Sequence, residues 1–214
     1  ETFKSRFKKS KVINEDITSD KFKAILKKQT KGVKIEGVVA GLPCQSFSSV
    51  GRAQDKFSMA KDKRNYFYKD FFECLKIIKP NFFVFENVRG ILSAKPNGVK
   101  IFDNILELSK KLGYVTLDDT SKMVFDTSEY GVPQVRKRVF VIGVKKKYSN
   151  LIPKIYDDLI NIHKDKKKFT VKDAISDLPP LKPGEGVEKI RVLKKNKNDY
   201  LKKITNSKFI YNHV

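Results

Sequence analysis

The stretch NFFVFEN at residues 81–87 is a continuous apolar run that turns polar only at Glu86 and Asn87. Such a run is typical of a strand that is buried on both faces. Two further runs have the same character, IEGVVAG at 35–41 and RVFVIGV at 138–144. We therefore expect three buried strands of one sheet, with polar side chains where the strands end.

Helical patterns separate these strands along the chain. The apolar spacing predicts three helices, over 20–31, 65–80 and 101–114. Three shorter strands are also predicted, at 11–14, 115–119 and 123–127, with the last two paired with each other. Strands that alternate with helices at short intervals predict an α/β fold with a parallel, doubly wound sheet.

The character of the sequence changes after Val144. Residues 145–214 are rich in lysine and contain DLPPLKPGEG at 177–186. Proline and glycine at this density are typical of a linker. We expect a core over residues 1–145, followed at 146–214 by a linker and the beginning of a second region.

The composition points to a polyanionic partner. Lys and Arg total 46 against 24 Asp and Glu, which gives a net charge of +22. Nucleic acid is the usual partner of such a surface, although a solvated lysine surface would also explain runs such as KDKKK at 164–168. The sequence shows neither an apolar run of membrane-spanning length nor a signal peptide, so we expect no membrane partner and a cytoplasmic protein.

The chain has two cysteines, which differ in their surroundings. With only two histidines beside them they make a poor zinc set, and no metal is expected. Cys74 lies within the apolar pattern of the helix at 65–80 and is interpreted as structural. Cys44 follows Pro43 in a polar loop, 42–63, that is rich in glycine and serine. It is therefore a candidate nucleophile, with a buried filler as the alternative.

Polar side chains are expected at the carboxyl ends of the strands, where α/β sheets carry their sites. Glu86 would lie at a partly dry rim, which raises the pKa of a carboxyl group toward the range useful for proton donation. Gln134, Arg136 and Arg138 alternate, so an extended backbone places them on one side, where they suit phosphate or a base carbonyl. The alternative for Glu86 is a solvated residue at the end of a strand. The alternative for the other three residues is an exposed basic edge strand.

Three motifs, GLPCQSFSSVG, FVFENVRGILS and YGVPQVRKRVFVIG, in this order resemble the DNA (cytosine-5) methyltransferase family of bacterial restriction–modification type. The resemblance covers about residues 1–145. FTVKDAISDLPPLKPGEG at 169–186 and the terminal YNHV are similar to the family's passage into its target-recognition region. The resemblance implies an incomplete Rossmann-like, S-adenosylmethionine-dependent methyltransferase sheet in a protein of the bacterial cytoplasm.

The resemblance also implies a role for each catalytic candidate. Cys44 would add to C6 of a cytosine, and Glu86 would contact N3 and the exocyclic amine. Arg138 would hold the base carbonyl, while Arg136 would support the loop and the backbone. The partner would be duplex DNA with the target base flipped out. The residues expected near the DNA are Gln45, Ser48 and Gln134.

The resemblance carries fewer contacts to the methyl donor, S-adenosylmethionine. Asp16 would accept a hydrogen bond from the adenine amine, and Ile17 would pack on the ring. Pro43 would line the methionine side. Phe67 stands where the family usually has a leucine beside the cofactor.

The sequence departs from the family pattern in what it lacks. It has no F-x-G-x-G turn, no acidic residue for the ribose hydroxyls and no closing segment after the recognition region. We expect a fragment, with one half of a split enzyme, completed by a complementary polypeptide, or a degenerate copy as alternatives. Two other functions also stay open, an inactive DNA-binding or partner-binding module and a tRNA cytosine-5 methyltransferase.

Overall fold

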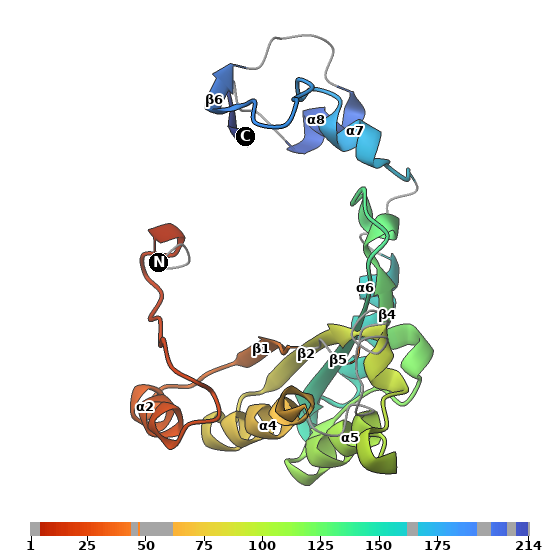
Figure 1. Ribbon diagram of the computed structural model, residues 1–214. Coiled ribbons are helices and arrows are strands. Elements are labelled where there is room, and N and C mark those ends of the chain that lie inside the picture. Colours follow the sequence, from red (N-terminus) through yellow and green to blue (C-terminus); the bar gives the residue numbers. More distant parts are fainter. Residues whose placement is uncertain are drawn as a thin grey trace. The chain divides into compact units, whose positions relative to one another are not determined.

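The computed structural model describes residues 5–43, 47, 62–161, 167–191, 198–204 and 209–213. The chain forms two compact units (Figure 1). The first unit comprises Glu1–Phe125 and Arg138–Leu159, and the second comprises Asp126–Lys137 and Ile160–Val214. The central sheet belongs almost entirely to the first unit.

The central sheet has five strands, β1 (Gly37–Gly41), β2 (Phe82–Val88), β3 (Tyr114–Val115), β4 (Val124–Asp126) and β5 (Lys137–Lys145). Their order is β1-β2-β5-β3, and β4 also pairs with β5. β1 and β2 are parallel, whereas β5 is antiparallel to β2 and to β3. The predicted α/β class is thus confirmed, but the sheet is mixed and not wholly parallel. A buried apolar run does not encode the direction of a strand.

In the part of the chain that the structure describes, four helices accompany the sheet: α2 (Asp20–Thr30), α4 (Phe67–Ile78), α5 (Ile101–Lys111) and α6 (Leu151–Asn161). The first three confirm the helices predicted from apolar spacing. The α6 helix was missed, although Ile152, Ile155 and Tyr156 follow the helical period. Short 3₁₀ turns complete the connections: η2 (Lys63–Tyr66), η3 (Arg89–Leu92), η4 (Pro96–Gly98), η5 (Thr120–Met123), η6 (Thr127–Tyr130) and η7 (Lys146–Tyr148).

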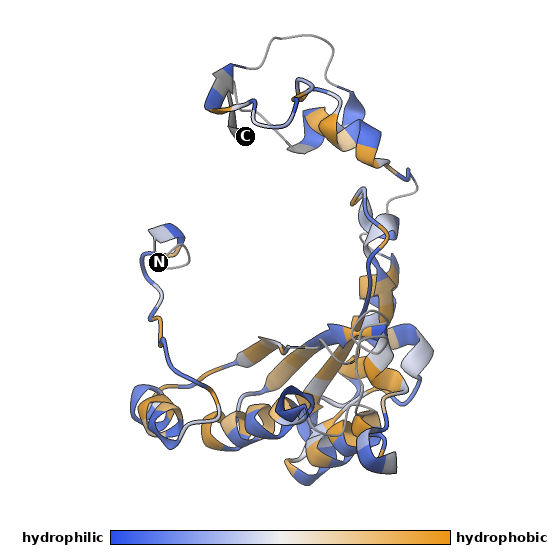
Figure 2. Ribbon diagram, viewed as in Figure 1, coloured by the Kyte–Doolittle hydropathy of each residue, from blue (hydrophilic) through white to orange (hydrophobic). Residues whose placement is uncertain are grey.

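The α4 helix packs on one face of β2. Phe83 and Phe85 alternate toward this face and are almost fully buried. The ring of Phe71 lies 5.8 Å from that of Phe83 and 5.6 Å from that of Phe85, measured between centroids. Figure 2 shows β2 and β5 as the apolar centre of this unit. This aromatic packing fixes the position of β2 against α4, and with it the position of the residues that end the strand.

The side chain of Tyr156 connects the α6 helix to β5 through hydrogen bonds. The Tyr156 hydroxyl donates to the carbonyl of Phe140 at 2.8 Å and accepts from the N–H of Ile142 at 3.0 Å. Both groups lie beyond the pairing of β3 with β5, which involves only Val144 and Lys145. The hydroxyl therefore takes the place of a ladder partner for β5.

Replacing Tyr156 by phenylalanine should lower the free energy of unfolding by on the order of 1–3 kcal/mol, because two buried backbone groups lose their partner. Burial raises the pKa of Tyr156 to about 12. The contribution of Tyr156 to stability is fully present below the pKa of tyrosine in the unfolded chain, about 10. This contribution is lost as the pH rises toward the pKa in the folded protein. Urea unfolding of wild type and Tyr156→Phe should therefore differ more at pH 8 than at pH 11. An equal difference at both values would contradict this account.

Three strand predictions were wrong. Residues 11–14 form no strand, because no described strand pairs with their backbone. The segments 115–119 and 123–127 do not pair with each other, since β3 and β4 each pair with β5. The strand predicted at 35–41 exists as β1, but it is not buried. Its Val39 is 73% exposed, because β1 is the last described strand at its end of the sheet.

The second unit contains α7 (Val171–Ile175), β6 (Val187–Arg191), α8 (Asp199–Ile204) and β7 (Phe209–His213). The α7 helix begins with a capping box between Thr170 and Asp173. Asn198 Nδ2 donates to the Asp173 carbonyl at 2.7 Å, which joins the end of α7 to the start of α8. β6 and β7 form an antiparallel pair. The proposal that 146–214 is a linker and the start of a recognition region stays a prediction.

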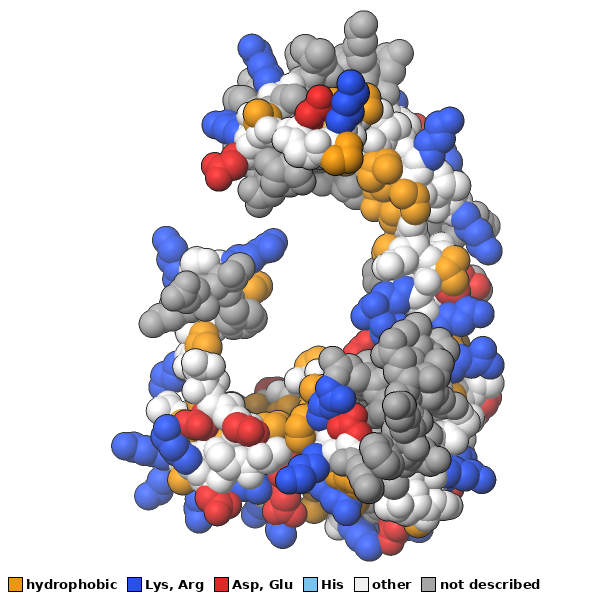
Figure 3. All heavy atoms as spheres, viewed as in Figure 1, with side chains coloured by type: hydrophobic (Ala, Val, Ile, Leu, Met, Phe, Trp, Pro, Cys, Tyr) orange, Lys and Arg blue, Asp and Glu red, His pale blue; other side chains and the backbone are white. Residues whose placement is uncertain are grey.

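Two properties concern the surface of the molecule. Lys and Arg side chains stand out over the face seen in Figure 3, in keeping with the net charge of +22. Within the described ranges, no helix has both the length and the apolar character needed to cross a membrane.

Candidate active site

Glu86 and Arg138 form an ion pair at the end of β2. The antiparallel register sets Glu86 opposite Phe140 and Val88 opposite Arg138, so Arg138 is the diagonal neighbour of Glu86 on one face. Arg138 Nε lies 3.0 Å from Glu86 Oε1. Both side chains are largely buried, with 19% and 28% exposed. The structure thus brings together two of the four predicted catalytic residues.

The β1 strand ends beside this ion pair. Gly41, its last residue, is the register partner of Glu86. Cys44 follows three residues later, within about 11 Å of chain from Gly41. Cys44, Gln45 and Ser48 lie outside the described residues, so their predicted roles stay predictions. Pro43 is described and exposed.

Phe47, three residues after Cys44, was missed by the sequence analysis. It is 3% exposed and belongs to the core of the first unit. Burial of its aromatic ring fixes Phe47 in the core of the first unit. The signal in the sequence was a phenylalanine among glycines and serines.

Gln134 and Arg136 lie in the second unit, in the loop before β5. Thr127 holds this loop through its backbone carbonyls. Its hydroxyl donates to the Gln134 carbonyl at 2.7 Å, and its N–H donates to the Arg136 carbonyl at 3.2 Å. Both side chains are exposed. The loop is fixed at its backbone while its polar side chains remain accessible, and their roles stay predictions.

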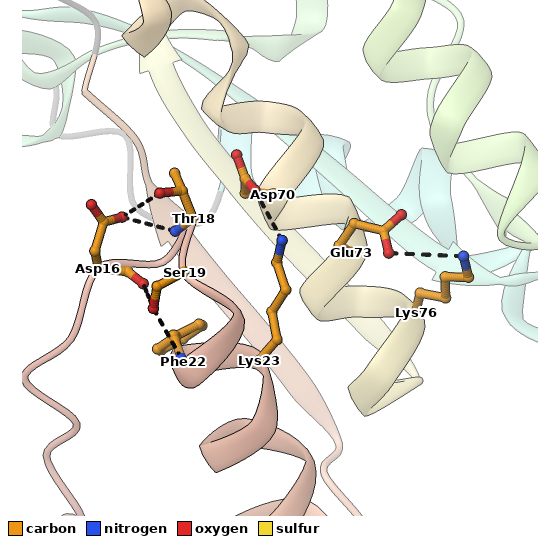
Figure 4. Close-up of polar contacts among 8 residues, drawn as sticks. All are labelled: Asp16, Thr18, Ser19, Phe22, Lys23, Asp70, Glu73 and Lys76. Atoms are coloured by element: carbon orange, nitrogen blue, oxygen red, sulfur yellow. Dashed lines mark hydrogen bonds and ion pairs between the residues drawn. The ribbon is translucent and has the colours of Figure 1, made fainter.

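Asp16 lies in the turn that begins α2 (Figure 4). Its Oδ1 accepts from the Thr18 N–H at 2.8 Å and from the Thr18 hydroxyl at 2.9 Å. These two hydrogen bonds lower the pKa of Asp16, and the bond from the Thr18 N–H has the larger effect. The lowered pKa keeps the carboxylate ionised. Ser19 accepts from the Phe22 N–H at 3.0 Å and so caps the helix. The carboxylate is exposed and held in one orientation.

The segment of Asp16 is joined to the helix that begins at Phe67. Lys23 of α2 lies 3.6 Å from Asp70 of α4, atom Nζ to Oδ1 (Figure 4). Ile17 and Phe67 are both half-buried. The described residues also form a pocket of about 500 Å³ along α2, lined by residues 10–15 with Lys21, Ile25 and Gln29. Its lining includes no predicted site residue.

Cys74 is buried, as the sequence analysis expected. It is 5% exposed, and burial raises the pKa of its thiol, so it is a poor nucleophile. Across the described ranges, no three His, Cys, Asp or Glu side chains come together in a way that would hold a metal ion.

The comparisons with known proteins agree with these motifs. The C-5 cytosine-specific DNA methylase family matches residues 1–213. The chain belongs to this family. The type II methyltransferase M.Bpa9945I of Bacillus paralicheniformis is 38% identical over 161 residues, which are 73% of this chain and 35% of that protein. M.DdeI of Desulfomicrobium norvegicum is 35% identical over 184 residues, 84% of this chain and 41% of that protein.

A solved structure gives the same answer for the fold. A protein encoded within an E. coli prophage, described as a candidate DNA modification methyltransferase, aligns with a TM-score of 0.62 at 28% identity. The alignment covers 92% of this chain and 51% of that one. The chain therefore spans about half of the matched structure and less than half of the two relatives above.

Proposed function

We propose that this chain is the part of a DNA (cytosine-5-)-methyltransferase that acts on the target base. The reaction is methyl transfer from S-adenosylmethionine to C5 of cytosine in duplex DNA. The observation that carries the proposal is the Glu86–Arg138 ion pair, which lies beside the end of the strand leading to Cys44. Family membership supports the reaction class.

Cys44 acts as the nucleophile in this proposal. Cytosine C5 is too weak a nucleophile to take a methyl group directly. Addition of the Cys44 thiolate to C6 makes C5 nucleophilic, and C5 then accepts the methyl group. Loss of the C5 proton restores the ring and expels the thiolate. The C6–S bond that forms in the first step breaks in the last one, S-adenosylmethionine would lose its methyl group and leave as the neutral thioether, and the cysteine is regenerated as a thiolate.

Glu86 and Arg138 act on the base itself. Glu86 contacts N3 and the exocyclic amine, and it favours the added state by sharing a proton with N3. Arg138 holds the base carbonyl and also orients Glu86 through Oε1. A fixed carboxylate in a partly dry site needs little reorganisation when charge develops on the base.

A duplex base cannot reach these groups while it is stacked, so the target base is flipped out. Gln45, Ser48 and Gln134 lie near the DNA in this proposal, and Arg136 supports the backbone. The exposed side chains of Gln134 and Arg136 and the net charge of +22 support contact with phosphates. The chain then works on DNA in the bacterial cytoplasm.

Asp16 is suited to hold the adenine of S-adenosylmethionine. Its Oδ1 is taken by Thr18, whereas its Oδ2 accepts no hydrogen bond from any residue that the structure describes. An ionised, exposed acceptor fits the adenine amine, and Ile17 beside it fits the ring. Pro43 and Phe67 are the remaining contacts that we propose. When bound, S-adenosylmethionine supplies the methyl group.

The sheet needs further polypeptide to complete this cofactor site. The described part of the sheet ends at β1, where Val39 is exposed, and the chain spans less than half of the relatives named above. We propose that a complementary polypeptide, in the same protein or in a separate one, supplies the glycine-rich cofactor motif.

The test of the proposed function is a chimera. The aligned part of this chain, 73% of its length, replaces the segment that it matches in M.Bpa9945I, and that protein supplies the rest of the fold. Bisulfite sequencing of plasmid DNA from cells that express the chimera should show protected cytosines at a recurring site. The same chimera with Cys44→Ser is the matched control. An unprotected plasmid, with the chimera folded and S-adenosylmethionine bound, would reject the proposal.

The chimera also separates two other functions. A tRNA methyltransferase would protect cytosines in tRNA and leave the plasmid unprotected. An inactive binding module would protect neither and would still retain DNA. The relatives reported above are named as type II methyltransferases, which favours DNA.

Asp16→Asn should weaken the binding of S-adenosylmethionine to the chimera roughly tenfold to a hundredfold, because an amide presents N–H groups to the adenine amine. Asparagine keeps the Oδ1 contacts to Thr18. Isothermal titration calorimetry measures the affinity. Asp20→Asn, in the first turn of α2, is the control of equal charge and should leave the affinity unchanged. Equal affinity for wild type and Asp16→Asn would remove Asp16 from the cofactor site.

A further inference from the structure

The two glycines of β1 have different surroundings. A Cβ added at Gly37 would lie 2.2 Å from the Phe82 ring, so this glycine is required for packing. A Cβ added at Gly41 would meet one described atom within 4 Å, Oε2 of Glu86, at 3.4 Å. The backbone of Gly41 is not in the left-handed region, so an L-residue could adopt it. Neither backbone conformation nor core packing in the described residues explains a glycine at position 41.

The two oxygens of the Glu86 carboxylate have separate surroundings. Oε1 lies 3.0 Å from Arg138 Nε in the ion pair. Oε2 lies 3.4 Å from the position that a Cβ atom would take at Gly41, and outside residues 40–42 no other atom of the described residues lies within 4 Å of that position. The ion pair with Arg138 therefore occupies one of the two carboxylate oxygens. Oε2 is therefore the oxygen left for the base, and its access depends on position 41.

We propose that Gly41 is a positioning residue, which keeps Oε2 of Glu86 open to water in the free chain and to the target base during the reaction. This inference rests on the proposed function. A hydrogen bond to Oε2 requires a partner atom at about 2.5–3.0 Å. A methyl carbon at 3.4 Å on the same side occupies part of that approach. Branched side chains at position 41 occupy more of it.

The first test measures Glu86 itself in the chain described here. The ¹³C resonance of the Glu86 carboxyl group is followed by NMR against pH in wild type, Gly41→Ala and Gly41→Val. Alanine at position 41 replaces water beside Oε2, so the titration midpoint of Glu86 should rise, and valine should raise it further. Val39→Ala is the matched control, because Val39 lies two residues earlier on the same strand and is exposed.

The second test measures methyl transfer by the chimera. Gly41→Ala should lower kcat roughly tenfold, and Gly41→Val roughly a hundredfold, because small displacements at the reacting atoms are costly. The KM for S-adenosylmethionine should not change. Thermal unfolding of Gly41→Ala should match or exceed wild type, since alanine restricts the unfolded chain. This separates a positioning role from a structural one.

The outcomes keep the two proposals apart. If Gly41→Ala leaves both the Glu86 midpoint and kcat unchanged, Gly41 has no role in access to Oε2. A raised midpoint with an unchanged kcat also overturns the inference, because the base then does not approach from this side. A wild-type chimera without activity rejects the proposed function, whereas the NMR titration still decides whether Gly41 keeps Oε2 open.

Discussion

Glu86→Gln should slow methyl transfer by roughly 10²–10⁴-fold while the fold and DNA binding are retained. Glutamine has the same shape, and its Oε1 can still lie beside Arg138 Nε, so the contact between β2 and β5 is preserved. A carboxamide cannot share a proton with N3 of the base. The loss should therefore fall on the chemical step. Single-turnover transfer of labelled methyl groups by the chimera measures that step without product release.

The control for this prediction is Glu107→Gln. Glu107 lies on α5, is 59% exposed and forms an ion pair with Lys111 at 2.7 Å. The substitution Glu107→Gln removes the same charge from the same unit without touching the Glu86–Arg138 ion pair. The rate of methyl transfer should therefore stay unchanged. If Glu86→Gln transferred methyl groups at the wild-type rate, proton sharing by Glu86 would be excluded, and the ion pair with Arg138 would be structural.

The sequence alone was sufficient to predict the two central strands of the sheet. The runs at 81–87 and 138–144 became β2 and β5 because continuous apolar residues have to be buried on both faces. The helices followed from apolar spacing, as in α4, whose Phe71 and Leu75 lie on the buried face. These features are local, and each one is encoded within a single segment.

The pairing of the strands was less predictable because it depends on distant segments. The antiparallel direction of β5 follows from where α5, β3 and β4 lead the chain, and no residue of β5 encodes it. Residues 11–14 have strand-like composition, yet a strand forms only where a partner satisfies its backbone. The exposure of Val39 has the same origin, since burial of β1 depends on what lies beside it.

The candidate site shows both situations. Glu86 and Arg138 were predicted from separate motifs, and the β2–β5 register brings them to 3.0 Å. The position of Gly41 under Oε2 could not be predicted, because it depends on the β1–β2 register and on the rotamer of Glu86. Motifs identify which residues carry chemistry, and the register determines which of their atoms are accessible.

Cys44→Ser should abolish methyl transfer, which is the largest effect expected of any substitution in this chain. A serine hydroxyl has a far higher pKa than a thiol, so it adds to C6 too slowly to support turnover. DNA with fluorine at C5 of the target cytosine blocks the proton loss that releases the thiol. The wild-type chimera should therefore form a covalent protein–DNA complex that survives denaturing electrophoresis, and the serine variant should form none.

Cys74→Ala provides the matched control, since it removes the only other thiol in the chain. Cys74 is 5% exposed on α4, and burial raises the pKa of its thiol, so its loss should affect stability and leave the covalent complex intact. A complex that forms in Cys44→Ser but not in Cys74→Ala would assign the nucleophile to Cys74. A complex that forms in both variants would place the reacting group on the portion supplied by M.Bpa9945I. Only a complex that depends on Cys44 alone connects the end of β1, beside Glu86, to the bond-forming step.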